Sequence, residues 1–117
     1  GEAAEPHLGA VAELLADGDR DVRAAACRAL GKHGEVAAPH LAAVAGLLSD
    51  RNMDIRQAAC SALGNHGEAV WPYLRAVAVC LSDDSWCVRA AACKALGNHG
   101  EAAVPHLEAV AKCLSDD

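Results

Sequence analysis

The chain has 117 residues and a net charge of −6, and 53% of its residues are hydrophobic although none is Phe. This acidic balance argues against nucleic-acid binding, which requires clustered Lys and Arg. No apolar run is as long as a membrane span, and no segment resembles a signal sequence. The core must therefore consist of Ala, Leu, Val and Cys, whose small side chains favour close packing of helices in a regular stack.

A repeat of 33 residues runs through the whole chain, and its clearest marks are Pro6, Pro39, Pro72 and Pro105. Such a repeat predicts a solenoid, in which each unit packs only against its neighbours. We expect one domain over 1–117, made of a half unit (1–17) and three full units (18–50, 51–83 and 84–116). Because the chain begins within a unit, we expect it to be part of a longer array.

The half unit is expected to form a single helix that corresponds to the second helix of a full unit. Each full unit then begins with a first helix, expected over 21–30, 54–63 and 87–96. In the first copy Val22, Ala26, Cys27 and Leu30 have the spacing of one buried helical stripe. Gly31 and its equivalents are expected to end these helices, because glycine can adopt the left-handed cap conformation.

The second helix of each unit is expected to begin near Glu35, Glu68 and Glu101. A carboxylate suits the positive end of the helix dipole there. The repeated proline lies in its first turn or so, where a missing N–H is tolerated. The helix is expected to end at the Ser-Asp pairs at 49–50, 82–83 and 115–116. One lone helix and three pairs give seven helices.

Five of the six cysteines occupy repeated positions, and the sixth, Cys87, replaces Asp21 and Asp54 near the start of a first helix. Cys27, Cys60 and Cys93 occupy the same position of successive units, and we call such a set of equivalent positions a column. Equivalent positions in stacked helices lie roughly 10 Å apart. That exceeds the reach of a disulfide, about 7 Å between Cα atoms. Cys80 and Cys113 alternate with Leu in a second column, as expected for buried positions. Buried free thiols favour a reducing intracellular compartment, and the localisation is otherwise open.

The repeated residues combine D-x5-R, A-A-C-x-A-L-G-x-H-G-E and P-x-L. In the second unit these residues are Asp50, Arg56, Ala58, Ala59, Ala62, Leu63, Gly64, Gly67, Pro72 and Leu74. The whole chain resembles HEAT repeats, of the short HEAT-like kind shared with phycobilin lyases and many scaffolds. The resemblance implies an all-α, right-handed α-α superhelix of helix pairs, with second helices on its concave face. It also implies a structural ladder of charge-assisted hydrogen bonds between Asp17, Asp50 and Asp83 and Arg23, Arg56 and Arg89.

The repeated turn histidines His33, His66 and His99 raise the alternative of a metal site. Deoxyhypusine hydroxylase, an enzyme that resembles HEAT-repeat proteins, binds iron through His-Glu pairs. In that family each pair directly follows the Arg of the first helix. The matching positions here hold Ala24-Ala25, Gln57-Ala58 and Ala90-Ala91, so those ligands are absent. One unit step also separates the histidines too far to share a metal. We therefore expect structural histidines, no metal, no cofactor and no catalytic residue.

Columns that vary between units are the candidates for binding. Three of them follow one second-helix face at i, i+4 and i+8. The predicted partner-binding residues there are Trp71, Arg75, Val79, Glu108 and Lys112, with Trp86 as a second contact at the loop edge. Trp and Arg are enriched at interface hot spots. We expect a non-catalytic scaffold or accessory subunit that binds a protein partner in a larger assembly. The alternatives are a HEAT-like enzyme, either bilin lyase-like or metal-dependent, and a designed repeat protein.

Overall fold

The structure is a computed structural model that describes residues 5–108. Over these residues the chain consists of helices joined by short turns, with no strand, and the predicted all-α solenoid of seven helices is confirmed. The α-helices are α1 (Glu5–Glu13), α2 (Arg20–Lys32), α3 (Leu41–Gly46), α4 (Met53–Gly64), α5 (Leu74–Val79) and α6 (Trp86–Asn98), and residues 104–108 are also helical.

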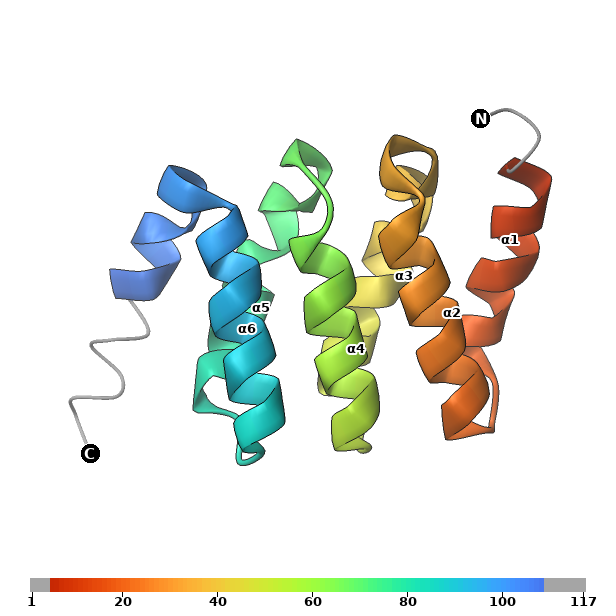
Figure 1. The fold of residues 1–117 in the computed structure, drawn as a ribbon, viewed down its shortest axis with the longest axis horizontal. Coiled ribbons are helices and arrows are strands. Elements are labelled where there is room, and N and C mark those ends of the chain that lie inside the picture. Colours follow the sequence, from red (N-terminus) through yellow and green to blue (C-terminus); the bar gives the residue numbers. More distant parts are fainter. Residues whose placement is uncertain (1–4, 109–117) are drawn as a thin grey trace.

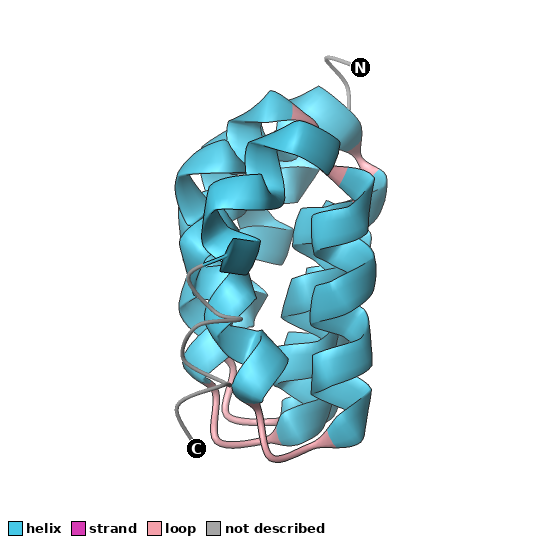
Figure 2. Cartoon of the chain, turned by 90° about the vertical axis from the view of Figure 1, so that its left-hand side faces the viewer, coloured by secondary structure: helices cyan, strands magenta, loops and turns pink. Residues whose placement is uncertain are grey.

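The helices form two layers. The first helices α2, α4 and α6 lie side by side, each packed on the next, in the front layer of Figure 1. The second helices α3 and α5 form the layer behind, which the view in Figure 2 separates from the first. Each second helix packs against the first helix of the following unit. The molecule extends over 47 × 29 × 16 Å, as expected when units are added along one axis.

The first helices start from side-chain caps supplied by the loops before them. Asp19 accepts a hydrogen bond from the N–H of Asp21 at 2.8 Å, and Asn52 accepts one from Asp54 at 2.8 Å. These are the usual N-cap interactions, which satisfy backbone donors that the first turn leaves without partners. Ser85, before α6, makes no such side-chain bond. The sequence prediction of where these helices begin is accurate to one residue.

The prediction that Gly31 ends a helix in the left-handed conformation is wrong. Helix α2 continues to Lys32, and the positive φ values belong to Gly34 (59°) and Gly100 (54°) in the turns. Gly31 is needed for another reason: a Cβ at this position would lie 3.0 Å from the Cα of Ala62 in the next first helix. Glycine therefore allows the two backbones to approach closely.

The second helices are less regular than the sequence predicted. Each begins as a 3₁₀ segment, of which η3 (Gly34–His40) and η5 (Glu68–Tyr73) contain Pro39 and Pro72, and η7 (Gly100–Ala103) leads into residues 104–108. Only six α-helical residues follow in α3 and in α5. Further 3₁₀ turns, η2 (Leu14–Ala16), η4 (Leu47–Ser49) and η6 (Cys80–Ser82), end the second helices. In these two units the α-helix starts after the proline, which lacks an N–H and crowds the preceding turn, whereas Pro6 and Pro105 lie in the first turn of α-helical residues.

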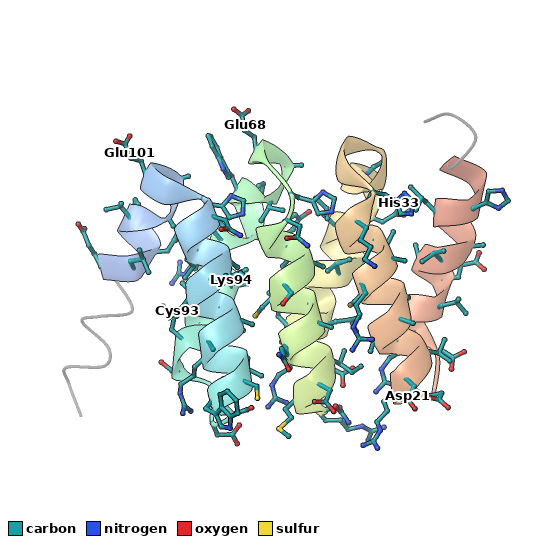
Figure 3. All side chains as sticks on the ribbon, viewed as in Figure 1. Asp21, His33, Glu68, Cys93, Lys94 and Glu101 are labelled. Carbon is teal, nitrogen blue, oxygen red and sulfur yellow. The ribbon has the colours of Figure 1, made fainter. Side chains whose placement is uncertain are left out.

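The core lies between the two layers and consists mainly of Leu, Val and Ala, with Leu30, Leu63 and Val77 fully buried. Cys27 and Cys60 are also fully buried, whereas the predicted burial of their counterpart Cys93 is wrong. Cys93 is exposed because it lies on the side of α6 away from α4 (Figure 3), where no helix of the described chain covers it. None of the described helices has the length and apolar character that crossing a membrane requires.

Candidate partner-binding surfaces

The aspartate and arginine columns connect consecutive units. Arg56 donates from Nε to Asp83 Oδ2 at 2.8 Å and from Nη2 to Asp83 Oδ1 at 3.1 Å. Its Nη1 donates to the backbone carbonyl of Asp50 at 2.8 Å, so one guanidinium joins the loops before and after its unit. The Asp83 hydrogen bond raises the pKa of Arg56, and Arg56 in turn lowers the pKa of Asp83. A partly buried guanidinium with planar, bidentate partners holds this junction firmly.

Among the described residues, the other two arginines of this ladder make fewer contacts. Arg23 donates to the backbone carbonyl of Asp17 at 2.8 Å and from Nη2 to Asp50 Oδ1 at 3.4 Å. Its Nε lies 3.2 Å from Asp50 Oδ2 but makes no hydrogen bond. Arg89 donates to the backbone carbonyl of Asp83 at 2.7 Å. Each aspartate side chain also accepts the N–H two residues further on, which fixes the loop before the next helix.

The turn histidines reach back to the preceding unit. His66 is buried, and its Nε2 lies 2.9 Å from the carbonyl oxygen of Leu30 near the end of α2. His99 makes the same contact with Leu63 of α4 at 3.2 Å. Since a carbonyl only accepts, Nε2 carries the proton in both rings. Within residues 5–108 no three His, Cys, Asp or Glu side chains form a cluster that could hold a metal ion.

Two buried cysteines that are not at equivalent positions of the repeat interact with each other. Cys60 of α4 and Cys80 of η6 belong to different columns, yet the Cys80 thiol interacts with the Cys60 thiol. This neighbour and burial raise the pKa of Cys60. Burial likewise raises the pKa of Cys27 to about 11. The thiols of Cys27 and Cys60 are therefore protonated and unreactive at neutral pH.

Trp71, Arg75 and Val79, which we call the second-helix stripe, form an exposed row on the second helix of the middle unit. Trp71 is 47% exposed and Val79 is 64% exposed, whereas Leu74 and Val77 of the same helix are buried. In the next unit Val104 and Glu108 occupy the equivalent columns and are exposed too. The remaining predicted residue of this face, Lys112, lies outside the described residues.

A second exposed apolar patch lies where the first helices begin, and we call it the loop-edge patch. It consists of Met53, which is 50% exposed, and Trp86, which is 72% exposed. These residues occupy the first position of α4 and of α6. The sequence singled out Trp86 and placed Met53 in the same column. Large apolar side chains in such positions are characteristic of interaction sites when they cluster.

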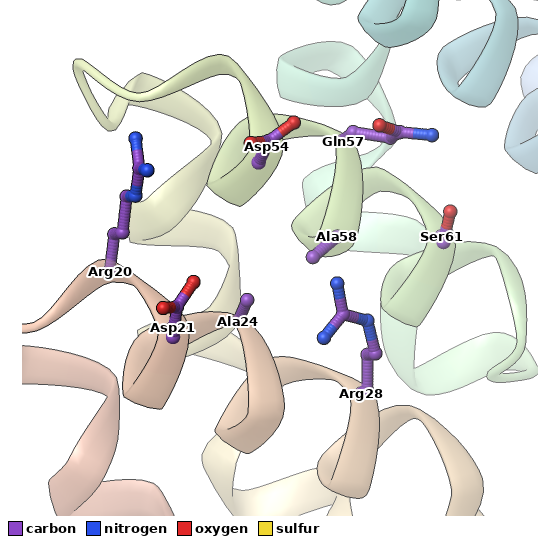
Figure 4. Close-up of a pocket in the computed structure, with 8 residues that line it drawn as sticks. All are labelled: Arg20, Asp21, Ala24, Arg28, Asp54, Gln57, Ala58 and Ser61. Carbon is purple, nitrogen blue, oxygen red and sulfur yellow. The ribbon is translucent and has the colours of Figure 1, made fainter.

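A polar groove between α2 and α4, absent from the sequence predictions, has a volume of about 390 Å³. Figure 4 shows Arg28 extending from α2 toward Ala58 of α4, with Asp54 on the opposite side. The groove is lined by Arg20, Asp21, Ala24, Arg28, Asp54, Gln57, Ala58 and Ser61. Ala24 and Ala58 are the signal that could have revealed it, because small residues on facing helices leave space between longer neighbours.

Comparison with solved structures gives an engineered protein, determined as a crystal structure by the Northeast Structural Genomics Consortium. The TM-score is 0.69 at 17% sequence identity, with 89% of this chain and 51% of the engineered chain covered. This chain therefore spans about half the length of that protein, and the likeness shows a shared fold only. No curated protein sequence matches. A family model described as HEAT repeats matches residues 6–79 and 41–117, so the chain belongs to the HEAT-repeat family.

Proposed function

We propose that this chain is a non-catalytic scaffold that binds a protein partner through the second-helix stripe. The observation that carries the proposal is the exposure of Trp71, Arg75 and Val79, which follow one another at intervals of four residues along this second helix. Trp and Arg supply much of the binding energy at protein interfaces, where their large side chains become desolvated. HEAT repeats are generally interaction scaffolds, and the family membership of the chain supports the same conclusion.

The contacts made by the residues that repeat in every unit support a non-catalytic role. The histidines His66 and His99 use Nε2 to bond backbone carbonyls, and Arg56 is paired with Asp83. Side chains with structural partners of this kind hold the units together. The residues that differ between units include exposed apolar side chains, Trp71 and Val79, beside the exposed Arg75, a combination that suits a surface for one partner. We propose that this partner belongs to a larger assembly in which the chain is an accessory subunit.

The test compares two double variants as bait for affinity capture. Trp71→Ala with Arg75→Ala removes the second-helix stripe, and Met53→Ala with Trp86→Ala removes the loop-edge patch as a matched control. A partner of the stripe is retained by the wild type and by the control but lost from the stripe variant. Calorimetry with that purified partner should give at least about 30-fold weaker binding to the stripe variant.

Circular dichroism and thermal melting of both variants check that the fold is intact. We expect little change, because all four side chains are exposed or at helix starts. Equal affinity of the wild type and the stripe variant would contradict the proposed surface. Loss of binding only in the loop-edge variant would transfer the site to the other patch.

A further inference from the structure

Three exposed polar side chains cross the middle of the first-helix layer. Arg28 of α2, Ser61 of α4 and Lys94 of α6 occupy one column, and we call them the cation row. Arg28 and Ser61 line the groove between α2 and α4 that Figure 4 shows. Ser61 and Lys94 line a second groove, between α4 and α6. The two cations therefore lie on either side of α4, separated by the small side chain of Ser61.

The cation row has no acidic residue in its own part of the repeat, although the chain as a whole is acidic. No Asp or Glu occurs in the stretches that contain the row, which are residues 22–34, 55–67 and 85–100. Within residues 5–108 no ion pair includes Arg28 or Lys94, whereas Arg56 lies 2.8 Å from Asp83. In a chain with a net charge of −6, exposed cations without carboxylate partners favour an anionic ligand.

We propose that the cation row binds an acidic peptide segment of a protein partner. The axes of packed helices lie roughly 8–10 Å apart, so Arg28 and Lys94, two helices apart, are separated by roughly 20 Å. An extended peptide advances roughly 3.3–3.6 Å per residue, so two carboxylates about six residues apart reach both cations. The guanidinium of Arg28 binds one carboxylate through two parallel hydrogen bonds, and the ammonium of Lys94 binds the other as a point charge.

Helix α4 leaves a path for the peptide between the two cations. Ala58 is buried and Ser61 is small, so neither side chain projects across the path. The Ser61 hydroxyl can donate to a backbone carbonyl of the peptide, and the half-buried amide of Gln57, one turn earlier on α4, can donate or accept. An extended peptide needs such partners because its backbone N–H and C=O groups are not paired internally.

The surroundings of the cation row favour a peptide over a nucleic acid. Asp21 and Asp54 line the same groove as Arg28, in the first turns of α2 and α4. Glu68 and Glu101 follow in the turns beyond the other ends of α4 and α6 (Figure 3). A nucleic acid carries a phosphate at every nucleotide and would bring several of them against these carboxylates. A peptide with two separated carboxylates can meet the two cations alone.

The test is a titration of the protein with synthetic peptides, followed by two-dimensional NMR at about 20 mM salt, where charge interactions are weakly screened. The probe has two glutamates separated by five glycine and serine residues. It should shift the amide signals of the cation row and not those of the second-helix stripe, which lies in the other layer. Arg28→Gln with Lys94→Gln should weaken binding about tenfold or more. A peptide whose glutamates are separated by one residue reaches only one cation and should also bind more weakly.

Single variants distinguish a local contact from an effect of net charge. Arg28→Gln removes a cation of the row, and Arg51→Gln removes the same charge from an exposed position before α4. Only Arg28→Gln should weaken binding of the probe, by about threefold or more. Asp54→Asn removes a carboxylate from the groove and should strengthen binding. Circular dichroism checks that each variant is folded, as expected because the substituted side chains are all exposed.

Absence of shifts in the wild type at low salt would overturn the proposal. So would equal weakening by Arg28→Gln and Arg51→Gln, because binding would then depend on net charge alone. A short oligothymidylate that binds more tightly than the peptide, and is lost from the double variant, would assign the cation row to nucleic acid and overturn the peptide ligand.

Discussion

The two junctions between first helices contain the same residue types, but their contacts differ. At the α4–α6 junction, Arg56 Nε lies 2.8 Å from Asp83, and a Cβ at Gly64 would lie 2.8 Å from Ala95. At the α2–α4 junction the corresponding distances are 3.2 Å for Arg23 and Asp50 and 3.0 Å for Gly31.

The residue that follows the ladder aspartate accounts for part of the difference between the two junctions. Arg56 also lies 3.4 Å from Asp84, which adds a second carboxylate to its surroundings. At the equivalent position beside Asp50 the chain has Arg51, a like charge for Arg23. The comparison teaches that identical ladder residues give unequal contacts when the columns beside them vary. The three predictions below test this inequality, from the largest expected effect to the smallest.

Substituting the first-helix glycines by alanine should separate the two junctions most strongly. Gly64→Ala brings a Cβ against backbone and should destabilise the protein by about 1–3 kcal/mol. Gly31→Ala should destabilise it less, because the approach there is slightly wider. Gly97→Ala is the control in open space and should stabilise the protein by up to about 1 kcal/mol through helix propensity. Urea unfolding measures all three, and a stabilising Gly64→Ala would show that the helices are not in close contact.

Removing the ladder arginines should give the next largest difference. Arg56→Met loses hydrogen bonds to a carboxylate and should lower the free energy of unfolding by on the order of 2 kcal/mol. Arg23→Met should lower it by less, because its contacts with Asp50 are longer. Arg28→Met is the control, since Arg28 is exposed and none of the ion pairs in the described chain includes it. Equal losses for Arg23 and Arg56 would contradict the ranking of the junctions.

Acid should weaken the α4–α6 junction through Asp83. The guanidinium of Arg56 lowers the pKa of this carboxyl in the folded protein, while an unfolded Asp has a pKa of about 3.9. The stabilisation is therefore complete above the unfolded pKa and is lost as the pH falls through the folded value. The difference in unfolding free energy between wild type and Asp83→Asn should shrink on acidification from pH about 5 to about 2. A difference that stays constant over this range would show that the pair does not couple to the proton.

The sequence predicts most of the fold because the repeat presents each structural position several times within one chain. Because Leu30, Leu63 and Leu96 occupy the same column, the sequence alone indicates which side of the first helix is buried. The same logic predicted the exposed Trp71, which breaks its column. The family resemblance also anticipated which charged columns are involved in the ladder.

The sequence could not predict contacts between residues that belong to different columns. Gly31 and Gly64 occupy the same position of the motif, and only the structure shows that both allow close packing and that neither has the left-handed conformation. The contact of Cys60 with Cys80 joins two columns, so comparing equivalent positions does not reveal it. Cys93 has the sequence of a buried position but lies on a helix face that the described chain leaves open.

Two turn histidines connect the ends of α2 and α4 to the units that follow them. His66 bonds a carbonyl near the end of α2, and His99 bonds one near the end of α4. A helix whose last turn is completed from outside its own unit reaches full stability only when its neighbour has folded. Order therefore spreads between nearest neighbours, and unfolding begins at an end of the array. Under a pulling force the units should detach in succession, since each departure removes the cap of the helix before it.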